Sequence, residues 1–113
     1  MDHQHTQEDL RGPAAALREE IPEVLAAFAT LGRTAMAGGA LDTKTKELIA
    51  LAIAIVEECD GCVAAHARGA ARRGAGRAEV AEMIGVTIMM RGGPATVWGP
   101  RALEAFDQFS AAL

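Results

Sequence analysis

Hydrophobic residues recur along most of the chain at the three- and four-residue spacing of an amphipathic helix. The clearest stripe consists of Val24, Leu25, Phe28 and Leu31, and it follows Pro22, a residue type that is tolerated in the first turn of a helix. Glycine pairs and a Gly-Gly-Pro sequence interrupt the pattern, as expected where helices end. We expect five to six helices, at residues 13–20, 22–37, 43–56, 62–73, 78–90 and 95–109, and no strand.

The third of these predicted helices has an unusual pattern, because its second half has no polar face. Asp42 is a good N-cap for it and its first turns are polar, but every residue from Leu48 to Val56 is apolar. A helix that is apolar on all sides is normally buried, either in a core or between subunits. In a chain this small, the pattern favours an oligomer.

Length and composition narrow the fold class. The chain has 113 residues, which suffices for one domain, and half of them are apolar. Most of these are small or aliphatic and only 4% of residues are aromatic, a composition that suits close helix packing better than strands. We expect a single all-α domain at residues 13–113, preceded by a flexible polar tail at residues 1–12 that contains His3 and His5.

The charge pattern argues against nucleic acid and membrane partners. The net charge is -4, and the most basic stretch is Arg72-Arg73 with Arg68 and Arg77 nearby. We interpret these arginines as a solvated helix face rather than as an anion site. The N-terminus does not read as a signal peptide, and the longest apolar run is far shorter than the roughly 20 residues that span a bilayer. We expect a cytoplasmic protein, where a CxxC is more often redox-active or metal-binding than structural.

The candidate chemistry lies between residues 58 and 66. This stretch holds the only two cysteines, Cys59 and Cys62, and His66, the only histidine outside the N-terminal segment. A cysteine in the first turn of a helix meets the positive end of the helix dipole, which lowers the pKa of its thiol. His66 lies one turn further on and can accept the Cys62 proton, while Cys59 is placed to attack an oxidised Cys62. The pattern predicts a thiol-redox enzyme.

Other interpretations use the same residues. Zinc would take Cys59, Cys62 and His66 as ligands, with Glu47 or Glu58 as a fourth. The two cysteines can also be small buried hydrophobic residues, or the sensor of a non-catalytic redox module. We expect Trp98 to pack in the core rather than to line a substrate pocket.

The spacing of the candidate residues is similar to a known family pattern. Glu47, Cys59, Cys62 and His66 fit Glu-x11-Cys-x2-Cys-x3-His. The flanking sequences Gly39-Ala40-Leu41-Asp42 and Gly92-Gly93-Pro94-Ala95 also fit. From about Ile21 to Phe109, the chain resembles the carboxymuconolactone decarboxylase-like family, specifically its alkylhydroperoxidase D-type branch.

The resemblance implies an all-α fold that assembles as trimers or hexameric rings and reduces organic hydroperoxides without a bound cofactor. It implies that Cys62 is peroxidatic, that Cys59 is resolving, and that His66 and Glu47 form a proton relay. A lipoyl-bearing partner or a similar dithiol would regenerate the enzyme. The decarboxylase that names the family generally lacks the cysteine pair, so a decarboxylase-type reaction using His66 is the weaker alternative. One residue departs from the alkylhydroperoxidase pattern, because Gly61 stands where that enzyme has a histidine.

The distance between Glu47 and His66 is a separate question. Glu47 lies twelve residues before Cys59, which is ~18 Å along a continuous helix, and an antiparallel return to His66 covers only part of that distance. A direct contact requires a crossing or kinked pair of helices, a bridging water or a neighbouring subunit. Glu58, next to the cysteines, is the local substitute for Glu47, although a surface role at a helix end suits it better.

Overall fold

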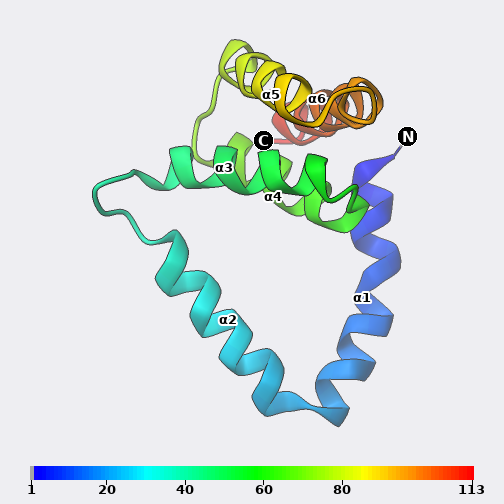
Figure 1. Cartoon of the computed structure of the whole chain (residues 1–113). Coiled ribbons are helices and arrows are strands. Elements are labelled where there is room, and N and C mark those ends of the chain that lie inside the picture. The colour runs from blue at the N-terminus through cyan, green and yellow to red at the C-terminus, as the bar shows by residue number, and fades with distance from the viewer. Residues whose placement is uncertain (1) are drawn as a thin grey trace.

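The computed structural model describes residues 2–113, which form six helices and no strand (Figure 1). The helices are α1 (His3–Glu20), α2 (Pro22–Met36), α3 (Thr43–Val56), α4 (Asp60–Arg72), α5 (Arg77–Arg91) and α6 (Ala95–Ala111). The predicted all-α fold is confirmed. Each predicted helix after residue 21 begins and ends within two residues of its observed bounds.

The N-terminal segment differs from the prediction. We expected a flexible tail at residues 1–12; Met1 lies outside the described residues, but from His3 onward the segment is the first half of α1. The Asp2 carboxylate caps this helix by accepting the His5 N–H at 3.0 Å. His3 is only 1% exposed, because its backbone N–H donates to the Gln108 side chain of α6 at 2.9 Å. These contacts anchor the start of α1 on α6.

Helix α4 lies at the centre of the fold, between α3, α6 and α1. Its buried residues are Val63, Ala64, Ala67, Ala70 and Ala71. Because four of the five are alanine, neighbouring helices approach the α4 backbone closely, and their larger side chains fill the core. The α5–α6 pair covers one side of α3 and α4 (Figure 1). Trp98 packs against this core, as predicted, with the Arg101 guanidinium 4.7 Å from its ring centre.

Helices α1 and α2 form a V whose point lies away from the other four helices (Figure 1). The apolar stripe predicted on α2 lies on the helix, but none of its residues is buried, and Phe28 is 69% exposed. Lys46 holds the end of α2 against the start of α3 by donating to the carbonyls of Ala35 and Ala37 at 2.9 and 2.6 Å. Within residues 2–113, no other helix buries this stripe.

Within the described chain, the burial predicted for α3 is found on one side of the helix, and burial of its other side between subunits stays a prediction. Leu51, Ala54 and Ile55 are buried, whereas Ile49 and Ile53 are exposed, because the other helices cover one side of α3. The exposed side continues across α5, where Met90 is 75% exposed. Among residues 2–113, no helix has both the length and the apolar character needed to cross a membrane.

Candidate functional site

The two cysteines lie at the N-terminus of α4 and are joined by a disulfide, with their Cα atoms 5.2 Å apart. Cys59 is the N-cap residue, and its Sγ accepts the backbone N–H of Cys62 at 3.2 Å. Cys62 is the third residue of the helix and is exposed, whereas Cys59 is half-buried. The predicted position of the pair at a helix start is confirmed, with the helix beginning two residues earlier than expected.

A tight turn between α3 and α4 fixes the position of Cys59. Glu58 has a φ of 55°, in the left-handed region that non-glycine residues rarely adopt. The Cys59 N–H donates back to the Ala54 carbonyl of α3 at 3.2 Å, which closes the turn. The Glu58 carboxylate lies 3.7 Å from the Arg91 guanidinium of α5. Glu58 is thus directed towards α5 and does not replace Glu47.

His66 and Glu47 are in direct contact within one chain. The ring Nδ1 of His66 lies 2.9 Å from Oε2 of Glu47, with exposed fractions of 35% for the imidazole side chain and 14% for the carboxylate side chain. This contact decides between the alternatives left open by the sequence. A carboxylate can only accept, so in the tautomer that suits this contact Nδ1 donates to Glu47 and Nε2 is the ring's acceptor.

The contact is possible because of Gly69. A Cβ atom on Gly69 would overlap the carboxylate of Glu47, so the carboxylate lies directly on the α4 backbone. Helix α4 runs back antiparallel to α3. Gly69, ten residues after Cys59, therefore lies almost level with Glu47, twelve residues before Cys59. The Glu47 side chain then reaches back one turn to His66. Our estimate from helix length missed this route, because it counted only the rise along the helix axes and not the reach of the Glu47 side chain.

A metal site is not assembled from these residues. Among residues 2–113, no three His, Cys, Asp or Glu side chains are grouped closely enough to hold a metal ion. In the oxidised state described here, the sulfurs of Cys59 and Cys62 are bonded to each other. The ligand set considered for zinc is therefore not formed in this state.

Two neighbours of the site escaped the sequence reasoning. One is Gly69, whose role depends on which helix packs against it. The other is Leu10 of α1, whose Cδ1 would lie 3.1 Å from a Cβ on Gly61, so α1 closely approaches the residue between the cysteines. Treating residues 1–12 as a tail hid this contact. Asp2, a good N-cap residue, was the signal for an earlier helix start.

Comparisons with known proteins agree with this architecture. An uncharacterized protein of Cupriavidus necator is 38% identical over 96 residues, covering 85% of each chain. Uncharacterized protein 4 in the cox locus of Paracoccus denitrificans is 41% identical over 86 residues, covering 76% of this chain and 78% of that one. The apo crystal structure of a carboxymuconolactone decarboxylase family protein from Legionella pneumophila superposes with a TM-score of 0.92, at 40% identity and covering 96% of both chains. The sequence profile named "Carboxymuconolactone decarboxylase family" matches residues 22–107. The chain therefore belongs to the carboxymuconolactone decarboxylase family.

Proposed function

We propose that the protein is a thiol-dependent peroxidase that reduces organic hydroperoxides through Cys59 and Cys62. The observation that carries the proposal is the disulfide at the start of α4, on the same helix as His66, whose imidazole is hydrogen-bonded to the Glu47 carboxylate. Such a site combines a thiol that alternates between two oxidation states with a group that moves protons. A hydroperoxidase needs both.

In the oxidative half-reaction, the Cys62 thiolate attacks the terminal oxygen of ROOH. The O–O bond breaks, the alkoxide leaves and takes a proton to become ROH, and Cys62 becomes a sulfenic acid. The Cys59 thiolate then attacks the Cys62 sulfur and expels hydroxide, which takes a second proton to become water. Two thiols and one hydroperoxide thus give one disulfide, one alcohol and one water.

His66 and Glu47 supply the proton transfers. With Nδ1 held by Glu47, Nε2 of His66 is the ring nitrogen left to exchange a proton with Cys62, which lies one turn earlier on α4. It accepts the Cys62 proton and returns it to the leaving alkoxide. Glu47 stabilises the imidazolium formed between these two steps.

In the reductive half-reaction, an external dithiol restores the pair. Its first thiolate attacks the sulfur of Cys62, the more exposed of the two residues, and the bond to Cys59 breaks. The Cys59 thiolate leaves into the N-cap position, where the Cys62 N–H already donates to its sulfur. The second thiol of the reductant then displaces Cys62, and the reductant departs as a disulfide. A dihydrolipoyl group, free or on a partner protein, has this chemistry, and no bound cofactor is required.

The functional unit that we propose is a cytoplasmic homo-oligomer, a trimer or a hexameric ring. Support comes from apolar surface that residues 2–113 leave uncovered. The α2 stripe around Phe28 and the α3–α5 face around Ile53 and Met90 are both exposed. Exposed apolar patches of this kind are typical of protein–protein contacts.

The test is peroxide consumption driven by dihydrolipoamide. We expect turnover of cumene hydroperoxide by the wild-type protein and none by Cys62→Ser. The matched variant, Cys59→Ser, should still form one equivalent of alcohol and a trapped sulfenic acid at Cys62, because only the resolving step is lost. A disulfide that forms and is reduced without peroxide turnover would instead indicate a redox-sensing module. Turnover of a lactone substrate that survives both Cys→Ser changes would indicate decarboxylase chemistry through His66.

A further inference from the structure

A groove runs between α1 and α4, next to the redox pair. It joins two cavities of about 330 and 730 Å³, since Gln7, Arg11 and Arg68 line both of them. The α4 wall of the groove consists of Gly61, Ala65, Arg68 and Arg72. Their spacing of four, three and four residues keeps them on one helix face. One end of the groove therefore reaches Gly61, between the two cysteines.

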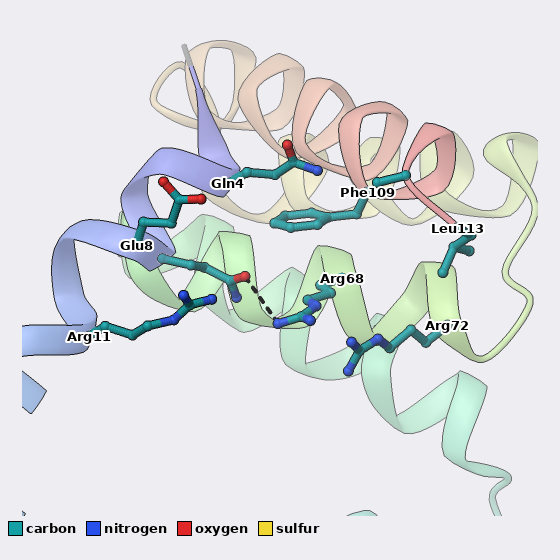
Figure 2. A pocket seen from close by; sticks show the side chains of 9 residues that line it. Gln4, Glu8, Arg11, Arg68, Arg72, Phe109 and Leu113 are labelled. Carbon is teal, nitrogen blue, oxygen red and sulfur yellow. Dashed lines mark hydrogen bonds between the residues drawn. The ribbon is translucent and has the colours of Figure 1, made fainter. Parts of the chain in front are cut away.

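The groove is rich in arginine. Four arginines line it, Arg11 and Arg18 from α1 and Arg68 and Arg72 from α4, against one acidic side chain, Glu8. Within residues 2–113, no carboxylate pairs with any of the four, whereas Arg77 outside the groove bonds twice to Asp107. Figure 2 shows the Arg11, Arg68 and Arg72 side chains on one side of the cavity and the Glu8 carboxylate pointing away from them. This arrangement leaves positive charge for a ligand to neutralise.

Arg68 lines both cavities, and a hydrogen bond holds its guanidinium in place. It is half-buried, and its guanidinium donates to the Gln7 side chain at 3.4 Å (Figure 2). A guanidinium carries five N–H donors, so this bond leaves most of them available. Two of them in a fork match the two oxygens of a carboxylate. The solvated face that we expected for Arg68 and Arg72 is therefore one wall of a cavity.

The groove becomes apolar towards the cysteines. Beyond Arg68 its lining includes Leu10, Ala14 and Ala15 of α1 and Ala65 of α4, with Arg18 as the one further charged side chain. Gly61, between the two cysteines, precedes Arg68 by seven residues on the same helix face, which corresponds to ~10 Å along the helix. A ligand with an anionic head and an apolar chain of that length would span the groove, with its far end next to the redox pair.

We propose that this groove binds an amphipathic organic carboxylate, with its carboxylate on Arg11 and Arg68 and its apolar chain directed along α1 towards Cys62. The link to catalysis rests on the peroxidase function proposed above, but the binding does not. Two reaction partners have this chemistry, a hydroperoxide that carries a carboxylate and a dithiol that carries one. Through the arginines, either would bind more tightly than its uncharged counterpart.

The binding test uses octanoate as the probe, titrated into the disulfide form of the full chain by calorimetry. We expect Arg68→Gln and Arg11→Gln each to weaken octanoate binding tenfold or more, because each removes charge-assisted hydrogen bonds. Arg101→Gln is the matched control, since it removes the same charge from α6 outside the groove. Absent binding, or binding that all three variants weaken equally, would overturn the proposal. Circular dichroism spectra that match the wild type establish that the variants are folded.

Two kinetic comparisons identify the source of the carboxylate. If the oxidant supplies it, Arg68→Gln lowers kcat/KM for linoleate hydroperoxide but not for its methyl ester. If the reductant supplies it, the variant lowers kcat/KM for dihydrolipoate but not for dihydrolipoamide. Octanoate binding that depends on Arg68 in a protein without peroxidase turnover would refute the proposed function and leave the binding site standing. Turnover in which neither comparison responds to Arg68→Gln would refute the role of the groove in catalysis.

Discussion

Replacing Gly69 with alanine tests the contact on which the proposed proton relay depends. The added methyl group would overlap the Glu47 carboxylate, which lies against the α4 backbone at this position. The backbone of a central helix cannot retreat easily, so the flexible carboxylate must move. We expect the 2.9 Å contact between Glu47 and His66 to break in Gly69→Ala, although neither residue has been changed.

Two opposing effects set the size of the stability change. Loss of a partly buried, charge-assisted hydrogen bond costs about 1.5–3 kcal/mol. The exchange of glycine for alanine inside a helix returns about 1 kcal/mol. The net loss is therefore ~0.5–2 kcal/mol, which lowers the Tm of a domain this size by about 3–10 °C. For the reaction, we expect kcat to fall about tenfold or more, because general acid–base steps contribute roughly a hundredfold or more and the free imidazole is no longer oriented.

The assay combines thermal unfolding at fixed protein concentration, peroxide turnover, and nitrogen NMR of the His66 ring. In the wild type we expect the Nδ1–H tautomer to dominate, and in Gly69→Ala the preference should be lost. Gly85→Ala on α5 is the matched control, because a Cβ there meets nothing within 4 Å. It should leave turnover unchanged and the Tm equal or higher. A Gly69→Ala protein with wild-type turnover and an unchanged ring tautomer would refute this reasoning.

Three further predictions follow from other parts of the structure. Gly99→Ala should destabilise the protein by about 1–3 kcal/mol in urea unfolding, because the added Cβ would lie 2.6 Å from Cγ2 of Ile84 and overpack the α5–α6 contact. A stability equal to the wild type would contradict that close approach. A hydrogen bond from the Gly76 N–H, aided by Lys44, lowers the pKa of Glu79. Ionised Glu79 therefore stabilises the folded protein fully above the ordinary glutamate pKa of about 4.3. This stabilisation is lost as the pH falls through the lower pKa of the folded state. Urea midpoints measured down this pH range should fall less steeply for Glu79→Gln than for the wild type, and parallel curves would refute the assignment. If the protein self-associates through the α2 stripe, as proposed, Phe28→Asp should abolish self-association in analytical ultracentrifugation while leaving helix content unchanged, since Phe28 is 69% exposed within residues 2–113; unchanged association would place the interface elsewhere.

Much of the fold could be predicted from the sequence because its signals are local. The Asp42 N-cap and the glycines after α2 and α5 mark helix ends, and their effect does not depend on distant residues. The CxxC pair was likewise placed correctly at a helix start. Its short spacing leaves the two sulfurs few arrangements once the helix begins.

The remaining features depend on which helices meet. The stripe around Phe28 has the periodicity of a buried face, but periodicity does not tell whether the covering surface belongs to the same chain. His3 was read as part of a tail because its partner, Gln108, lies more than a hundred residues away. The Glu47–His66 contact needed the knowledge that Gly69 lies beneath the carboxylate. Neither the burial of His3 nor the exposure of Phe28 leaves a local trace in the sequence, and the Glu47–His66 pair was implied only by the family resemblance.

The most direct test of the account is mass spectrometry of the sulfur states after one equivalent of an organic hydroperoxide is added to the reduced protein. We predict that each chain loses two hydrogen atoms, that a peptide linked between Cys59 and Cys62 appears, and that one equivalent of alcohol is released. Cys62→Ser should release none. A protein that keeps both thiols while the hydroperoxide persists would contradict the assignment of this pair as a peroxide-reducing site.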